Sequence, residues 1–236
     1  MTDTVPVLSL AQFTEGDAEA RRGFSTAVMQ AFRATGFLKL KDHNISAAQL
    51  EDTYEQAQAL FAQPEGVKRR YAAGLRGYTP FGVEHAKDSA LPDLKEFWQV
   101  GREPPAGIAI DEDLPPNVWP AEVPGAKSAF EGLYAGLDET GRLLLRALAP
   151  ELGEAEDFFD EKIRYGTSIL RVLHYPPVAE DTPVGSVRSA AHEDINFITI
   201  MVPAKGAGLE IKTRDGRWLA VIAEPGELIV NSGDML

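Results

Sequence analysis

The stretch that decides the fold is His192-Glu193-Asp194-Ile195-Asn196-Phe197-Ile198-Thr199-Ile200. It follows a proline-bounded extended segment and is rich in β-branched and aromatic residues, a composition typical of a strand. Side chains two positions apart in a strand point to the same face. The pattern therefore predicts that His192 and Asp194 face one interior point and that Glu193 points away.

An imidazole and a carboxylate that converge on one point supply two members of a 2-His-1-carboxylate facial triad. Such a triad holds non-haem Fe(II) on one face and leaves the opposite positions open for substrate and O₂. His192 and Asp194 are therefore candidate metal ligands, although an isolated His-x-Asp pattern more often satisfies backbone groups. No histidine follows His192 before Leu236. Of the other histidines, His85 fits a solvated loop and His174 a strand position that faces away from Arg171 and Tyr175 better than either fits a ligand position.

The composition excludes several classes of site and partner. The chain has 236 residues, of which 44% are hydrophobic, so it fits one large domain or a domain with an appendage. The absence of cysteine excludes disulfides, zinc-thiolate sites, Fe–S clusters and thiol nucleophiles, and it fits a reducing cytoplasm. The formal net charge of −13 disfavours nucleic acid and anionic membranes as partners. With no signal peptide or membrane span evident, we expect a cytoplasmic protein.

Helical spacing marks three segments. Apolar residues recur at helical intervals in each of them. Gly36 ends the first, and a Ser46-x-x-Gln49 capping box precedes the second. The predicted helices are residues 21–35, the segment between Ser46 and Pro64, and residues 126–148.

Strand patterns are sparse before Gly166 and frequent after it. The early strands are residues 5–10, 37–40 and 96–100, with a long loop predicted at 72–92 and a proline-rich extended crossover at 104–124. The later strands are residues 168–175, 195–202, 209–213, 218–222 and 227–231, with a hairpin turn at 214–217. Helices followed by a run of antiparallel strands predict an α+β protein whose C-terminal part is a sandwich or barrel.

Several motifs follow one another in a fixed order along almost the whole chain. The first half contains Gly36-Phe37-Leu38, Asp42-His43-Asn44-Ile45, Gly77-Tyr78 and Lys95-Glu96. The second half contains Tyr175-Pro176-Pro177, the His-x-Asp pair, Asp215-Gly216-x-Trp218 and Asn231-x-Gly233-Asp234. This order resembles the isopenicillin N synthase-like family of Fe(II)/2-oxoglutarate-dependent oxygenases.

The resemblance implies a double-stranded β-helix (jelly-roll) core with an N-terminal helical region packed against it. It divides the chain into an N-terminal non-haem dioxygenase region, residues 1–125, and the long helix with the oxygenase core, residues 126–236. It implies Fe(II) held by His192 and Asp194, with 2-oxoglutarate as co-substrate. The family's second ligand histidine and an Arg-x-Ser that binds 2-oxoglutarate follow the block ending in Asp234. Since neither is present, we expect the chain to be truncated before its C-terminal strands.

The resemblance also assigns candidate binding residues. Tyr175 matches a tyrosine that reaches a 2-oxoglutarate carboxylate, with a tyrosine packed at a strand end as the alternative. Arg171 shares the face of Tyr175 in a regular strand and suits an anionic substrate, unless it is a surface arginine on an edge strand. Arg76 and Tyr78 lie where the family often places substrate contacts, although a structural loop fits equally well. Phe197 is a candidate for the lining of the substrate pocket.

The function implied is an enzyme that oxidises a small molecule with O₂ and converts 2-oxoglutarate into succinate and CO₂. The substrate step is a hydroxylation or another oxidation, such as a desaturation or ring closure. Two alternatives stay open, an isopenicillin N synthase-like Fe(II) oxidase that does not use 2-oxoglutarate and an inactive jelly-roll ligand-binding protein. Neither the substrate nor the oligomeric state follows from the sequence.

Overall fold

The computed structural model describes residues 4–85, 91–103, 105, 107, 115–204, 206, 208–213 and 215–236. The chain forms two compact units, each assembled from separate segments. Unit 1 comprises Met1–Asn44, Glu139–Ile163 and Glu193–Leu236, and unit 2 comprises Ile45–Asp138 and Arg164–His192. Each unit therefore contains residues from both sides of the division expected at residue 125. Parts of the predicted long loop and crossover, and Arg214 of the predicted turn, lie outside the described residues.

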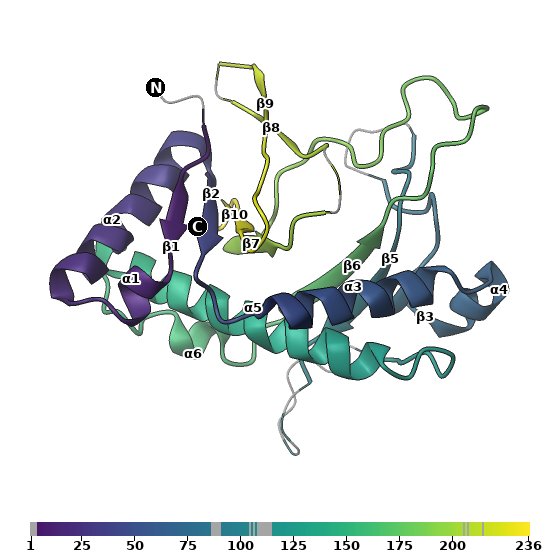
Figure 1. The fold of residues 1–236 in the computed structure, drawn as a ribbon, viewed down its shortest axis with the longest axis horizontal. Coiled ribbons are helices and arrows are strands. Elements are labelled where there is room, and N and C mark those ends of the chain that lie inside the picture. Colours follow the sequence, from purple (N-terminus) through teal and green to yellow (C-terminus); the bar gives the residue numbers. More distant parts are fainter. Residues whose placement is uncertain are drawn as a thin grey trace. The chain divides into compact units, whose positions relative to one another are not determined.

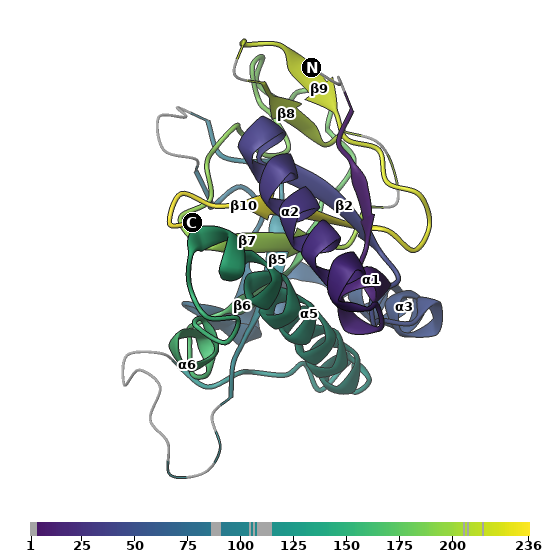
Figure 2. The ribbon, with the colours of Figure 1, turned by 90° about the vertical axis from the view of Figure 1, so that its left-hand side faces the viewer.

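Unit 1 is built on a four-stranded sheet in the order β1-β2-β10-β7 (Figure 2). β1 (Val7–Ser9) runs parallel to β2 (Phe37–Lys41), whereas β10 (Leu228–Ser232) is antiparallel to both β2 and β7 (Ile198–Met201). β10 thus lies between a strand from the start of the chain and one from its last third. The four strands predicted for these segments are confirmed, with β1 and β7 shorter than expected.

Capping residues set both ends of α2 (Ala18–Thr35), the longest described helix that lies wholly within unit 1. The helix begins where the Asp17 side chain accepts hydrogen bonds from the backbone amides of Glu19 and Ala20. It ends at Gly36, whose φ of 77° is left-handed and suits a residue without Cβ. Shorter helices are α1 (Ala11–Thr14), η2 (Pro150–Leu152) and α6 (Asp160–Ile163).

A separate hairpin completes the described strands of unit 1. β8 (Glu210–Lys212) pairs antiparallel with β9 (Trp218–Ala220), and the Thr213 amide donates to the Arg217 carbonyl at 2.8 Å. The predicted hairpin pairing of these two strands is thereby confirmed. Ile211 from this hairpin is buried in a small core that contains Val5, Val221 and Ile229.

Unit 2 contains an antiparallel sheet in the order β3-β4-β5-β6. Its strands are β3 (Ala72–Ala73), β4 (Arg76–Thr79), β5 (Glu96–Gly101) and β6 (Ile169–His174). The prediction of a continuous loop at 72–92 is wrong, because β3 and β4 lie within it. Their small and polar residues give little strand signal, but β4 pairs with the fully buried β5, and this tertiary pairing outweighs local propensity.

Long helices cover much of unit 2. α3 (Ala47–Phe61) begins as predicted, with the Ser46 side chain accepting from the Gln49 amide. The short helices α4 (Glu65–Lys68) and η1 (Arg69–Tyr71) follow. α5 (Ala126–Leu148), the long teal helix of Figure 1, has the predicted bounds and continues from unit 2 into unit 1 after Asp138. Among the described helices, none is both long and apolar enough to span a membrane.

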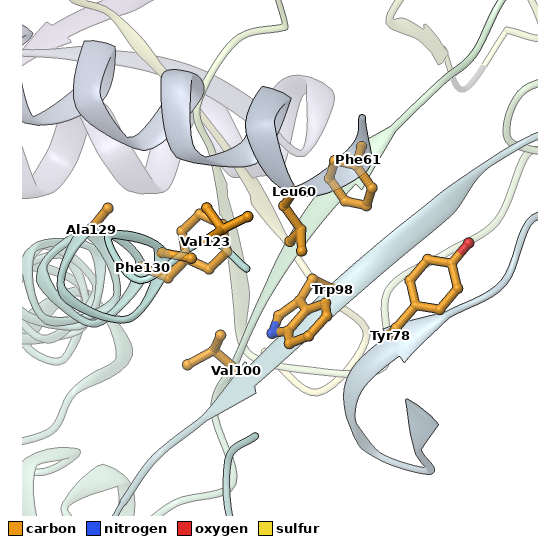
Figure 3. Packing of buried hydrophobic residues seen from close by; sticks show 9 residues of the cluster. Leu60, Phe61, Tyr78, Trp98, Val100, Val123, Ala129 and Phe130 are labelled. Carbon is orange, nitrogen blue, oxygen red and sulfur yellow. The ribbon is translucent and has the colours of Figure 1, made fainter. Parts of the chain in front are cut away.

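The core of unit 2 is organised around Trp98, which is fully buried (Figure 3). Leu60 from α3 points toward the indole in Figure 3, and Val100 and Tyr78 extend the same cluster along β5 and β4. Phe130 of α5 adds a second fully buried aromatic side chain. The register of β5 against β4 and β6 therefore decides which side chains of these strands remain outside this core.

A buried carboxylate lies at the edge of this core. Glu96 accepts from Lys68 at 2.6 Å, from the Tyr78 hydroxyl, and pairs with His174 at 2.8 Å. The Lys68 and Glu96 side chains are only 7% and 6% exposed. Burial alone would raise the pKa of Glu96, but the hydrogen bonds from these three partners outweigh it and lower the pKa. Glu96 therefore stays charged and compensates the buried ammonium.

We expect Glu96→Gln to lower the free energy of unfolding by about 3 kcal/mol at neutral pH, because it leaves Lys68 buried without its main counter-charge. A carboxylate with a lowered pKa in the folded state stabilises fully above its unfolded pKa and loses this contribution as the pH falls through the folded pKa. The difference between wild type and variant should therefore shrink in acid, as measured by urea unfolding. The matched control is Glu122→Gln, since Glu122 also pairs with a cation and a tyrosine but is exposed. An equal loss in both variants would contradict the role of burial.

Candidate active site

The candidate metal ligands lie in a segment without regular secondary structure. No helix or strand occurs from Tyr175 to Phe197, and β7 begins only at Ile198. The expectation that His192 and Asp194 lie on a strand is therefore wrong, and strand alternation does not orient them. Local side-chain bonds replace ladder bonds here, because Thr199 donates back to Asp194 and Asn196 donates to Thr199.

His192 is held in one tautomer by the backbone. Its Nδ1 lies 2.8 Å from the carbonyl oxygen of Ala190. A carbonyl only accepts, so Nδ1 carries a proton, and in the neutral imidazole the lone pair then lies on Nε2. A neutral imidazole that donates through one nitrogen and coordinates through the other is the usual arrangement of a metal-bound histidine. His192 is exposed and lies at the end of unit 2.

Asp194, which belongs to unit 1, is oriented by two adjacent strands. Its Oδ2 accepts from the Thr199 hydroxyl at 2.6 Å and from the Asn231 side-chain amide at 2.9 Å. Thr199 in β7 and Asn231 in β10 are direct partners in the sheet register. Donors on one carboxylate oxygen fix the plane of the group, as is common for carboxylates that bind metals.

The chain after β10 returns to the same segment. The Asp234 amide donates to the Asp194 carbonyl at 2.9 Å, and the Met235 amide donates to the Asn196 carbonyl at 3.1 Å. A Cβ atom at Gly233 would lie 2.3 Å from that Asn196 carbonyl oxygen. Only glycine permits this close approach, which accounts for Gly233 at this position.

In unit 2, β6 separates two sets of side chains. His174 pairs with Glu96 and stacks on Phe61 at 5.1 Å, on the side of the buried core. Arg171 lies on the other face, with its guanidinium 5.0 Å from the ring centre of Phe97. The predicted alternation of His174 and Arg171 is therefore confirmed.

Arg171 is partly paired but still accessible. Its Nη1 donates to Glu84 Oε1 at 2.9 Å, and 44% of its side chain is exposed. A guanidinium has five N–H donors, so this contact leaves further donors for a carboxylate or carbonyl of a ligand.

Tyr175 follows β6 directly and is half-buried. Within the described part of the chain its hydroxyl has no hydrogen-bond partner. Burial raises the pKa of Tyr175, so the hydroxyl stays protonated at neutral pH. A protonated phenol can donate to a ligand carboxylate.

The other predicted contact residues are held by the protein itself. Tyr78 is 1% exposed, and its hydroxyl lies 2.8 Å from Glu65 and close to Glu96. Arg76 is 3% exposed and donates to the Leu75 carbonyl at 2.9 Å. These contacts support structural roles, and substrate binding by either residue stays a prediction. Phe197 in unit 1 is half-buried and packs edge-on against Phe159 at 5.5 Å between ring centres.

The side chains of His192 and Asp194 are compatible with two of the ligands of a metal ion such as Fe(II). Among the described residues, no group of three or more His, Asp and Glu side chains is spaced to hold a metal ion. The tautomer of His192 and the oriented carboxylate of Asp194 nevertheless fit the nitrogen and oxygen ligands of a facial triad.

Two family models match the chain. The non-haem dioxygenase in morphine synthesis N-terminal family matches residues 5–122, and the 2OG-Fe(II) oxygenase superfamily matches residues 166–236. A 2-oxoglutarate-Fe(II) type oxidoreductase, ppzD of Metarhizium majus, is 28% identical over 98% of this chain and 74% of its own length. The 2-oxoglutarate-dependent dioxygenase citB of Monascus ruber is 30% identical over 98% of this chain and 75% of its own.

Solved structures give the same likeness. A 2OG-Fe(II) oxygenase family protein from Caulobacter crescentus is 39% identical, with a TM-score of 0.86, and covers 100% of this chain and 75% of its own. A full-length Neurospora crassa protein, solved in complex with alpha-KG (2-oxoglutarate) and thymine, is 28% identical, with a TM-score of 0.86, and covers 98% of this chain and 74% of its own.

We expect Thr199→Val to weaken the binding of divalent metal about tenfold, because it removes a donor that orients Asp194. The free energy of unfolding should fall by only about 2 kcal/mol for the two hydrogen bonds lost, one to Asp194 and one from Asn196. Calorimetric titration with Mn(II) and urea unfolding measure the two effects. The control is Thr213→Val, which removes a similar hydroxyl donor to Asp215 in the β8–β9 hairpin. Equal metal affinity in both variants would contradict the role of Thr199.

Proposed function

Because the chain belongs to the 2OG-Fe(II) oxygenase superfamily, we propose that His192 and Asp194 are two of the protein ligands of its iron. The protein is a non-haem Fe(II)- and 2-oxoglutarate-dependent dioxygenase that oxidises a small molecule with O₂. The observation that carries the ligand assignment is the hydrogen bond from His192 Nδ1 to the Ala190 carbonyl, which directs Nε2 to a coordinating role. The two donors on Asp194 Oδ2 support the same assignment.

The double-stranded β-helix core is part of this proposal. It is supported by the likeness to solved oxygenases and by the antiparallel pairing that dominates the sheets of both units. In that fold, antiparallel strands surround the cavity in which ligands bind.

The chain's own residues have distinct tasks in the proposed site. When bound, Fe(II) supplies the redox chemistry that couples decarboxylation of 2-oxoglutarate to oxidation of the substrate. Asp194 contributes a negative charge that favours a divalent cation, and Thr199 and Asn231 keep its carboxylate in place. The Tyr175 hydroxyl, protonated at neutral pH, donates to a carboxylate of 2-oxoglutarate.

Arg171 is proposed to select the substrate. Its guanidinium is held over Phe97 and beside Glu84, yet nearly half of its side chain is exposed. We therefore assign a small substrate with a carboxylate or carbonyl oxygen that accepts from Arg171. Phe197 remains a proposed apolar contact of the same substrate.

The relatives' names disfavour both alternatives. Curated relatives are named 2-oxoglutarate-dependent enzymes, and the similar Neurospora crassa protein has been solved in complex with alpha-KG. An oxidase independent of 2-oxoglutarate would bind iron but would be unaffected by the keto acid. An inactive binding protein would bind no stoichiometric iron.

The decisive test is an anaerobic titration of the full-length protein with Fe(II) and then 2-oxoglutarate. We expect a visible metal-to-ligand charge-transfer band that saturates near one equivalent, because the keto acid chelates the iron. Asp194→Ala should bind no stoichiometric iron and show no band. Glu193→Ala, which changes the exposed carboxylate between the two candidate ligands, should retain both. Stoichiometric Fe(II) in Asp194→Ala would refute the ligand assignment.

Tyr175→Phe separates the co-substrate from the metal. Removal of the hydroxyl deletes a donor to 2-oxoglutarate without touching His192 or Asp194, so the KM for 2-oxoglutarate should rise about tenfold. The Kd for Fe(II) should stay within about twofold, because the hydrogen bonds that orient the two metal ligands are unchanged. An unchanged KM for 2-oxoglutarate would remove Tyr175 from the site.

A further inference from the structure

The irregular segment that carries His192 is anchored by residues that directly precede β5. The Leu94 amide donates to the Val187 carbonyl at 3.0 Å. The Ala190 amide donates to Asp93 Oδ1 at 2.9 Å, and Lys95 Nζ donates to the Ser189 hydroxyl at 3.4 Å. All these residues belong to unit 2, so contacts within one unit hold the end of the segment.

Asp93 is the central group of this anchor. It is 2% exposed, and its second oxygen accepts from Lys95 Nζ at 2.8 Å. Lys95 also pairs with Glu84 at 2.7 Å. Burial alone would lower the pKa of Lys95, but its bonds to Asp93 and Glu84 outweigh it and raise the pKa, so the ammonium stays charged. With each oxygen bonded to a different donor, the Asp93 carboxylate has little freedom to rotate.

Ala190 connects this carboxylate to the candidate ligand. Its N–H donates to Asp93, and its carbonyl accepts from His192 Nδ1 at 2.8 Å. Both groups belong to one residue, so fixing the amide restricts where the carbonyl can lie. The carbonyl in turn determines the tautomer and the ring direction of His192.

We infer that Asp93, held by Lys95, is a positioning residue for His192. The inference rests on the proposed role of His192 as an iron ligand. Asp93 touches neither the imidazole nor any atom that would bind metal; it acts through the backbone of Ala190. The carboxylate thus lets a residue of the N-terminal half tune a metal ligand about a hundred positions later, as outer hydrogen-bond partners of ligands do in metal sites.

The test compares Asp93→Ala with Glu84→Ala in the full-length protein. Each variant removes one carboxylate from Lys95, but only Asp93→Ala releases the Ala190 amide. We expect the Kd for Fe(II), titrated anaerobically without co-substrate, to rise at least about tenfold in Asp93→Ala and to stay within about twofold in Glu84→Ala. If Asp93→Ala does not fold, Asp93→Asn replaces it. The side-chain amide of this variant can accept from only one of the two donors, so the Kd for Fe(II) should rise by a smaller factor than in Asp93→Ala.

A second readout needs no metal. In ¹⁵N NMR spectra of the apoprotein, at a pH where the imidazole is neutral, wild type and Glu84→Ala should show His192 protonated at Nδ1. The Asp93 variant should show a mixture of tautomers. Unchanged tautomer and Kd in the Asp93 variant, or equal losses in the Glu84 variant, would overturn the inference.

A His192→Ala variant separates this inference from the proposed function. If it binds Fe(II) as tightly as wild type, the ligand assignment itself fails. If it loses iron while Asp93→Ala keeps it, only the positioning role of Asp93 is refuted.

Discussion

The pairing of β10 with β7 is the constraint on which the orientation of Asp194, one of the two proposed metal ligands, depends. Its register sets Asn231 opposite Thr199, so one donor from each strand reaches the same oxygen of Asp194. The close approach of Gly233 then fixes the backbone of that segment. The carboxylate is therefore oriented by sheet geometry, which is stiffer than a loop with only local contacts.

Features that depend on neighbouring residues could be predicted from the sequence. The bounds of α5 follow from sustained amphipathic spacing before Pro150, and the start of α3 follows from Ser46 and Gln49. β3 and β4 could not be predicted, because β4 is stabilised by pairing with β5, and β3 by pairing with β4, rather than by their own residues. Strand character at His192 is overestimated by composition alone, since side-chain bonds to Thr199 replace strand pairing before β7 begins.

The same distinction applies to the site. The His-x-Asp pair and Tyr175 were recognisable because the order of motifs along the chain gave them context. Thr199 and Asp93 were not, because their partners depend on strand register and on contacts across many residues. Tyr78 and Arg171 are both candidates for substrate binding, but Tyr78 is buried and Arg171 is accessible. The sequence alone does not display this difference in burial.

The position of β10 beside β2 also affects how the chain reaches its native state. Gly36 and Ser232 are joined across 196 positions. During synthesis, one edge of β2 stays unpaired until β10 has been made, although the strand contains Leu38 and Leu40, which are fully buried in the native sheet. Such long-range pairing slows folding and leaves an open strand edge exposed to other chains. The nascent protein should therefore depend on chaperones until β10 has been translated.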